Sequence, residues 1–155
     1  MRNALHIHGD PMTTIAYKDG VIAYDGRCTA GGTIIYDDFD KMRERDGAFF
    51  FGAGGISEIN DLIKAYHGEE ISGDCGALAI ICKSGELSLI SYEEGKIVES
   101  SVLPDKAYAI GSGRDHAYTA LDMGASAYQA VEMAAKRDTG TGGKIRTFTV
   151  KVEQQ

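Results

Sequence analysis

Polar residues of complementary chemistry stand at the ends of predicted strands and helices, where their side chains can meet. Thr13 opens one predicted strand, Asp25 ends the next, and Lys41 follows Asp25 by 16 positions. Ser112 and Asp138 each lie beside glycines at the end of a strand or helix. Taken singly, each has a structural explanation, such as a surface ion pair or a helix cap. Together, a hydroxyl, an ammonium and two carboxylates are groups that nucleophilic catalysis uses, so the set indicates one shared site.

Two glycine-rich motifs in the chain lack residues that their usual chemistry requires. In TGTGGK, residues 139–144, Asp138 replaces the first glycine of a phosphate-binding loop, and Ile145 replaces the hydroxyl residue that would bind magnesium. The GSG around Ser112 lacks the second spacer of a nucleophile elbow, and no acid and histidine follow it in the matching order. We therefore predict neither a nucleotide site nor a Ser-His-Asp hydrolase.

The histidines and cysteines do not form a recognisable metal or disulfide pattern. His6 and His8 alternate as on one face of a strand, but no third ligand stands near them. Cys28, Cys75 and Cys82 are odd in number, share no CxxC spacing and lie in or beside strand-like segments. We predict reduced structural thiols, no metal site and no cofactor.

Composition restricts the classes of partner. The chain has 155 residues, of which 43% are hydrophobic, enough for the core of one domain. Its 23 acidic residues outnumber its 16 basic ones and give a net charge of −7, which disfavours nucleic-acid binding. No apolar run approaches the roughly 20 residues of a membrane span, and residues 1–11 lack the apolar core of a secretory signal. We expect a cytoplasmic protein that binds neither nucleic acid nor membrane.

The elements that must position these residues follow from hydrophobic period and turn signals. Strands are predicted over residues 13–18, 21–25, 33–43, 48–53, 77–83, 86–92, 96–100, 107–111 and 144–152, with hairpin turns at Asp19-Gly20, Asp46-Gly47, Ser84-Gly85 and Glu94-Gly95. One helix is predicted over residues 57–67, capped by Ser57, with Ile59, Leu62, Ile63 and Tyr66 on one face. Two more are predicted between residues 114 and 137, interrupted at Gly124, with Ser126 and Gln129 in capping-box spacing. This order predicts an α+β architecture in which helices cover a strand sandwich.

The ordered motifs resemble a known enzyme family. TTIAYKDGVIAYDGRCTAGGTI, which begins at Thr13, resembles the start of mature proteasome β-subunits and of HslV-type peptidases, which are N-terminal nucleophile hydrolases. Lys41 has the family's spacing from Asp25, and FGAGG is similar to its strand-to-helix turn. AIGSG resembles the serine loop, and AAKRDTGTGGKIRTFTV resembles the segment with aspartate, a hydroxyl residue and glycines. The resemblance extends over nearly all of residues 13–150.

The resemblance implies a four-layer αββα sandwich with antiparallel sheets. It implies that Thr13 is the nucleophile once it is N-terminal, with its own α-amine as the base. Lys41, held charged by Asp25, would lower the proton affinity of the hydroxyl and stabilise charge in the transition state. Ser112 and Asp138 would orient the amine, Thr141 would complete that network, and the Gly54 N–H would serve as oxyanion donor.

Two departures from the family alter these expectations. Only one helix is predicted between FGAGG and GSG where the family has two, so one helical layer should be reduced. Met12 precedes Thr13, whereas proteasomal propeptides end in glycine. We interpret residues 1–12 as an extension or propeptide, or as lying upstream of a true start at Met12, from which a methionine aminopeptidase would expose Thr13. Residues 13–155 are then a single peptidase domain.

The implied function is that of a threonine peptidase acting in an oligomeric compartment. Its substrates would be peptides or unfolded polypeptides, its assembly a homo-oligomeric ring, and its partner an ATPase unfoldase. Two alternatives stay open: a small-amide hydrolase, and a catalytically silent scaffold or assembly protein of the same fold. Gly52, near the nucleophile, further indicates an open specificity pocket.

Self-association is also expected from the alanine-rich helices. One face of these helices has few charges, and a single domain does not easily bury both faces of each helix. The residues of this face are Ala117, Ala120, Leu121, Ala127, Val131 and Ala134.

Overall fold

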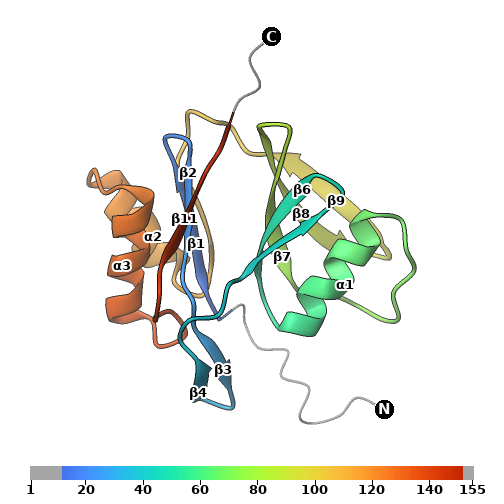
Figure 1. Cartoon of the computed structure of the whole chain (residues 1–155), viewed down its shortest axis with the longest axis horizontal. Helices are drawn as coiled ribbons and strands as arrows, with labels where there is room; N and C mark the ends of the chain where they lie inside the picture. The colour runs from blue at the N-terminus through green and yellow to red at the C-terminus, as the bar shows by residue number, and fades with distance from the viewer. Residues whose placement is uncertain (1–11, 152–155) are drawn as a thin grey trace.

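Two antiparallel sheets pack face to face, and helices cover the outer side of each sheet (Figure 1). The computed structural model describes residues 12–151. The four-stranded sheet has the order β10-β1-β2-β11, with β1 (Thr14–Lys18), β2 (Val21–Tyr24), β10 (Tyr108–Gly111) and β11 (Arg146–Thr149). The five-stranded sheet runs in chain order through β5 (Met42–Arg45), β6 (Ala48–Ala53), β7 (Leu78–Lys83), β8 (Glu86–Glu93) and β9 (Lys96–Ser101).

The helices form two unequal outer layers. Helices α2 (Arg114–Asp122) and α3 (Ala127–Arg137) pack on β1, β2 and β10 of the four-stranded sheet. The single helix α1 (Ile56–Tyr66) packs on the five-stranded sheet (Figure 1). The predicted αββα sandwich with one reduced helical layer is therefore confirmed.

Four two-residue turns connect neighbouring strands as the sequence predicts. Each turn places a non-glycine residue and then a glycine at positive φ, the backbone that a type I′ hairpin requires. At the first turn φ is 49° for Asp19 and 79° for Gly20, and Lys18 pairs directly with Val21. The other three turns are Asp46-Gly47, Ser84-Gly85 and Glu94-Gly95.

Strand alternation separates the central core from the helical layers. In β1 and β2, Ile15, Tyr17, Ile22 and Tyr24 point between the sheets, where they pack with buried residues of β6 and β7. The intervening Ala16 and Ala23, together with Ala109 of β10, face α2 and α3. Small side chains on this face allow the two helices to approach the four-stranded sheet closely.

The single long strand predicted over residues 33–43 is wrong. The structure has a short ribbon of β3 (Cys28–Ala30) and β4 (Thr33–Tyr36), then a break before β5. The break occurs because residues 37–39 bind elsewhere: Phe39 N–H donates to Gly26 O at 3.0 Å, and Lys144 N–H donates to Asp37 O at 2.7 Å. The second bond also explains why the last strand begins at Arg146 and not at Lys144. In Figure 1 the β3–β4 ribbon projects from the body of the domain.

The predicted cap of α1 is also wrong. The helix begins at Ile56 with Gly55 as N-cap, and no side chain caps it, so Ser57 lies within the first turn. By contrast, the predicted capping box of α3 is confirmed: Gln129 N–H donates to Ser126 Oγ, and the Gln129 side chain accepts from Ser126 N–H.

The charge-poor face of α2 and α3 is turned inward. Ala117, Leu121, Ala127, Val131 and Ala134 are buried beneath the helices, and Ala120 is half-buried. The helices α2 and α3 use this face to cover their own sheet, so it leaves no apolar surface for a neighbouring copy, and self-association stays a prediction. The exposed apolar residues of this layer are Met123, Tyr128 and Met133.

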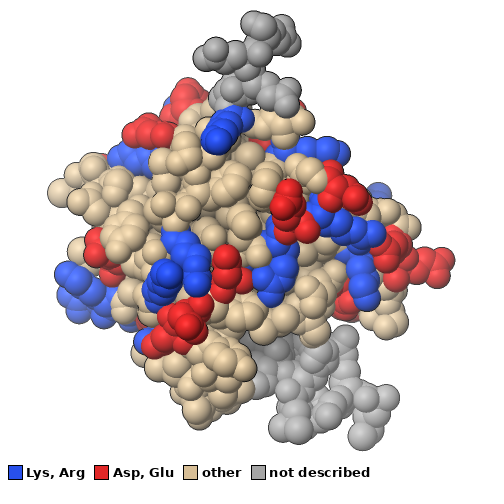
Figure 2. Space-filling model, in the orientation of Figure 1, with Lys and Arg blue, Asp and Glu red and all other residues tan. Residues whose placement is uncertain are grey.

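The cysteines lie where structural thiols are expected. All three cysteines are free thiols, and Cys75 and Cys82 are buried in the two cores, as expected of structural residues. None of the helices described is long and apolar enough to cross a membrane. On the face shown in Figure 2, acidic and basic side chains are interspersed around an uncharged central area.

The two serines at helix starts give a matched test of these caps. We expect Ser126→Ala to lower the free energy of unfolding by about 1 kcal/mol, because it removes a capping bond. Ser57→Ala should change it by less than about 0.5 kcal/mol, since Ser57 is exposed and caps nothing. Urea unfolding followed by circular dichroism measures both changes. Equal losses in the two variants would contradict the assignment.

Candidate active site

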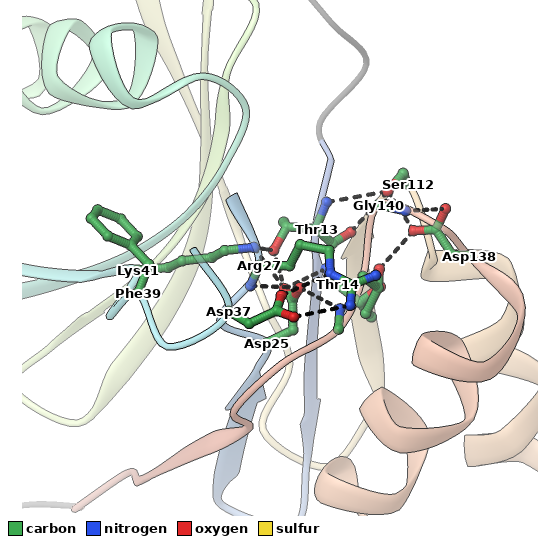
Figure 3. Close-up of polar contacts among 12 residues, drawn as sticks. Thr13, Thr14, Asp25, Arg27, Asp37, Phe39, Lys41, Ser112, Asp138 and Gly140 are labelled. Carbon is green, nitrogen blue, oxygen red and sulfur yellow. Dashed lines mark hydrogen bonds and ion pairs between the residues drawn. The ribbon is translucent and has the colours of Figure 1, made fainter. Parts of the chain in front are cut away.

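The ends of strands from both sheets bring Thr13, Asp25 and Lys41 together (Figure 3). Thr13 directly precedes β1, and Asp25 directly follows β2, so the β1–β2 hairpin places them on neighbouring strands. Lys41 directly precedes β5 at the edge of the other sheet. The three residues therefore meet where the two sheets adjoin, although 28 positions separate the first from the last.

The Thr13 hydroxyl lies between a cation and an anion. It accepts a hydrogen bond from Lys41 Nζ and donates one to Asp25 Oδ1. Lys41 Nζ also lies 2.8 Å from Asp25 Oδ1. All three residues are buried, with exposed fractions of 2% for Thr13, 0% for Asp25 and 7% for Lys41. Burial lowers the pKa of Lys41 from its usual value, and the Asp25 carboxylate acts in the opposite direction.

Backbone N–H groups, as well as Lys41, bind the Asp25 carboxylate. Its Oδ1 accepts from Thr14 N–H at 3.2 Å, and its Oδ2 accepts from Gly142 N–H at 2.9 Å and from Arg27 N–H at 3.3 Å. A buried charge needs such partners because it has lost its hydration shell. These bonds position Asp25 independently of the lysine.

A second network connects the Thr13 nitrogen to Ser112 and Asp138. Thr13 N–H donates to Ser112 Oγ at 3.2 Å, and the Ser112 hydroxyl donates to Asp138 Oδ2 at 2.6 Å. Thr141 Oγ1 donates to the same carboxylate oxygen at 2.6 Å and lies 2.7 Å from Thr14 Oγ1. Asp138 is available for these bonds because it lies at the C-terminal end of α3, with an extended backbone. The structure thus joins Ser112, Asp138 and Thr141 at the nitrogen side of Thr13.

The glycines on either side of Ser112 allow its loop to touch the chain at Thr13. Gly111 has φ of 108°, and a Cβ on it would overlap the carbonyl oxygen of Thr13. A Cβ on Gly113 would overlap Thr14 Oγ1. Without side chains at both positions, Ser112 reaches the Thr13 nitrogen.

Gly54 and Gly52 line a cavity of about 450 Å³ beside Thr13 and Lys41. Gly54 has φ of 140°, and a Cβ there would lie 3.0 Å from the Cβ of Ala77. The sequence indicated an open specificity pocket at Gly52, and Gly52 does line this cavity. The position of its missing side chain, however, is filled by a neighbour. A Cβ on Gly52 would lie 2.8 Å from Ile59 Cγ2, so the glycine accommodates Ile59 of α1, although its backbone still lines the cavity.

Three residues of the site region were not singled out from the sequence. Thr14 contacts Thr141, and Arg27 forms a two-point ion pair with Asp37, from Nε at 2.8 Å and from Nη2 at 3.2 Å. The Arg27 guanidinium lowers the pKa of Asp37 below its usual range. Asp37 carried no usable signal, because it falls within the segment predicted as a continuous strand.

The described residues contain no group of three or more histidine, cysteine, aspartate or glutamate side chains that could hold a metal ion. The two histidines considered from the sequence, His6 and His8, lie outside the described residues. In this chain the Thr13 nitrogen is a peptide nitrogen bonded to Met12, and it therefore donates a hydrogen bond and cannot accept a proton.

Comparisons with known proteins place the fold. No family model matches the chain, and no curated protein matches its sequence. Eukaryotic HslV from Trypanosoma brucei superposes with a TM-score of 0.65 at 18% identity, covering 88% of this chain and 97% of that one. Thiobacillus denitrificans BPH gives a TM-score of 0.63 at 17% identity, and its complex with epoxomicin gives 0.60 at 17%; each covers 92% of this chain and 99% of the other. At these identities the likeness shows a shared fold, that of the N-terminal nucleophile hydrolases.

Two aspartates of this region give a matched test of the buried ion pair. We expect Asp25→Ala to lower the free energy of unfolding by about 3–5 kcal/mol, because Lys41 keeps a buried charge without its partner. Asp37→Ala removes a carboxylate whose side chain is 43% exposed and solvent-screened, so the loss should be much smaller. Thermal and urea unfolding compare the two variants. Similar losses would show that the Asp25–Lys41 pair is not desolvated in solution.

Proposed function

We propose that this chain is a threonine peptidase of the proteasome and HslV type, with Thr13 as an N-terminal nucleophile. The observation that carries the proposal is the position of the Thr13 hydroxyl, bonded at once to Lys41 Nζ and Asp25 Oδ1 inside a buried site. A threonine that only opened a strand would not need a buried ammonium at its hydroxyl. The cavity that adjoins this hydroxyl provides space for a substrate.

The base in this mechanism is the α-amine of Thr13 itself. Once the bond to Met12 is cleaved, the nitrogen that now donates to Ser112 Oγ becomes a free amine, with an ordinary pKa of about 7.7–8.0. It takes the proton of the Thr13 hydroxyl, and Oγ1 attacks the carbonyl carbon of the scissile bond. Ser112 and Asp138 orient the amine through the 3.2 and 2.6 Å bonds described above.

Lys41 acts on the hydroxyl electrostatically. Its ammonium favours the alkoxide character that Oγ1 gains as it loses its proton, and Asp25 holds the ammonium in place. The effect is strong because the pair is buried, where charges are weakly screened. Neither residue has to exchange a proton with the substrate.

The remaining steps transfer this proton to the leaving amine and restore the Thr13 hydroxyl with a proton from water. Attack converts the carbonyl oxygen into an oxyanion, for which we assign the Gly54 N–H as donor. The intermediate collapses by breaking the carbon–nitrogen bond, and the departing amine takes the proton held by the Thr13 ammonium. A water molecule then attacks the resulting ester and gives a proton to the Thr13 amine. As the ester's carbon–oxygen bond breaks and the acid leaves, the Thr13 ammonium passes this proton to Oγ1.

Activation requires removal of residues 1–12, either as a propeptide or by an aminopeptidase acting on a chain that starts at Met12. Residues 13–155 are then the working peptidase domain. We further propose a cytoplasmic homo-oligomeric compartment, a ring, that takes peptides or polypeptides unfolded by an ATPase. The exposed apolar residues of the β3–β4 ribbon and of the α2–α3 layer favour such an assembly. They are Ile34, Ile35, Tyr36, Met123, Tyr128 and Met133.

Substitutions at the nucleophile test the mechanism. A chain processed to Thr13 should cleave small peptide amides, and the chain that retains residues 1–12 should not, because its nitrogen is an amide. Thr13→Ala should abolish turnover, and Thr13→Ser should keep part of it, since a hydroxyl and an amine remain. Release of a fluorescent amine measures the rate. Full activity of the unprocessed chain would contradict the proposal.

Two lysines separate an electrostatic role from a surface charge. Lys41→Ala in the processed chain should lower kcat/KM by at least about 100-fold, because it removes the cation at the hydroxyl. Lys64→Ala is the matched control, since Lys64 is exposed on α1 and far from this chemistry in the fold. Circular dichroism verifies that both variants are folded. Equal activity of the two variants would overturn the role of Lys41.

The pH profile follows from the same two groups. The amine must be unprotonated, so kcat/KM should rise through its pKa, about 8 in an unperturbed amine. Lys41 must be charged, so kcat/KM should fall as pH rises through the pKa of Lys41, which burial places below the usual lysine value of about 10.4. Initial rates on an uncharged peptide amide measure the profile. A rate that stays constant up to pH 10.4 would contradict the requirement for charged Lys41.

A further inference from the structure

The cavity beside Thr13 has one wall on the face of the five-stranded sheet that α1 covers. Arg43 pairs with Phe50 across β5 and β6, and Phe50 packs beneath α1 with Ile59. Arg43 therefore points to the side of the sheet that α1 covers. Lys41 lies two positions before Arg43, so it faces the same side. Both residues line the cavity.

The charged residues that line this cavity are all positive. Arg27, Lys41 and Arg43 line it, and none of the described residues that line it is aspartate or glutamate. Lys41 is paired with Asp25 and Arg27 with Asp37, each at 2.8 Å. Two of the three cationic residues in the lining are therefore neutralised by a carboxylate, and the third is Arg43.

Arg43 has no carboxylate partner in the part of the chain that the structure describes. Its Nη1 donates to the carbonyl oxygens of Asp40 at 2.8 Å and Met42 at 2.9 Å, and its guanidinium lies 5.1 Å from the ring centre of Phe39. These contacts hold the Arg43 side chain in place through Nη1 and one face of the guanidinium. The guanidinium retains donors that can bind a carboxylate at two points, a geometry that arginine favours.

We propose that the cavity selects an acidic substrate residue, aspartate or glutamate immediately before the scissile bond, and that Arg43 determines this selectivity. The inference rests on the proposed function for its position next to the bond that Thr13 attacks. Phe39, Ile56 and Ile59 line the same cavity and would contact the methylene groups of the acidic side chain. An isosteric amide would fit the same space but would leave Arg43 without an anion.

Binding to the full chain tests this without requiring catalysis, because the cavity is present, with Met12 in its lining, before the bond to Thr13 is cleaved. Fluorescein-labelled Ala-Ala-Glu-amide, Ala-Ala-Gln-amide and Ala-Ala-Leu-amide are compared by fluorescence anisotropy. We expect the glutamate peptide to bind at least about tenfold more tightly than the other two, which corresponds to about 1.4 kcal/mol. The preference should weaken as salt is raised. Equal affinities, or tighter binding of the leucine peptide, would overturn the inference.

Variants of two arginines on β5 assign the preference to a residue. Arg43→Gln should remove the preference for glutamate, and Arg43→Lys should keep part of it, because the charge remains and the two-point geometry is lost. Arg45→Gln is the matched control: Arg45 lies two positions further along β5, pairs with Glu69, and does not line the cavity. It should leave the preference unchanged. Thermal unfolding verifies the fold of all three variants, and a preference that survives Arg43→Gln would overturn the assignment.

Cleavage by the chain processed to Thr13 separates the inference from the proposed function. The glutamate peptide amide should have a kcat/KM at least about tenfold above that of its glutamine counterpart, and Arg43→Gln should equalise the two. If the peptides bind with the expected preference but none is cleaved, the peptidase function fails and the selectivity of the cavity for an acidic side chain stands. If all are cleaved at equal rates, the function stands and the inference is overturned.

Discussion

The buried ion pair between Asp25 and Lys41 is the interaction on which the rest of the site depends. Two charges at exposed fractions of 0% and 7% have lost most of their hydration, so each must be compensated within the protein. The carboxylate is compensated by Lys41 and by backbone donors at Thr14, Arg27 and Gly142. Because Lys41 and Gly142 lie 16 and 117 positions from Asp25, the pair forms only in the complete fold. The Thr13 hydroxyl then lies against both charges and acquires a polarity that a strand-end threonine does not have.

Close backbone approach is the second constraint on the site. The loop around Ser112 reaches the chain at Thr13 only because Gly111 and Gly113 lack side chains. A similar condition applies at Gly143, where a Cβ would overlap the carbonyl oxygen of Asp37. Next to this contact lies the hydrogen bond from Lys144 N–H to Asp37 O, which ends the β3–β4 ribbon before the chain reaches Lys41. These glycines therefore contribute by leaving space for neighbouring segments to approach.

The unequal helical layers give the two sides of the sandwich different roles. On the four-stranded sheet, alanines on both the strands and the helices form a dense layer that holds Asp138 at the C-terminal end of α3. On the five-stranded sheet, a single helix begins beside the nucleophile, and its first turns form part of the cavity wall. The first side supports the nitrogen network of Thr13, whereas the second presents the space and the arginines that a substrate would meet.

The sequence by itself determined most of the strands and helices, the hairpin turns and the set of residues that meet at Thr13. These follow from local rules: period-2 alternation, Asp-Gly and similar turns, capping residues, and motif order along residues 13–150. It did not determine the β3–β4 ribbon, the uncapped start of α1 or the inward face of α2 and α3. Each of these depends on contacts between segments far apart in the chain, such as Lys144 with Asp37. That Arg43 has no carboxylate partner among the described residues is likewise a property of the tertiary structure, because the number of charges in a sequence does not show which of them are neutralised by a neighbour.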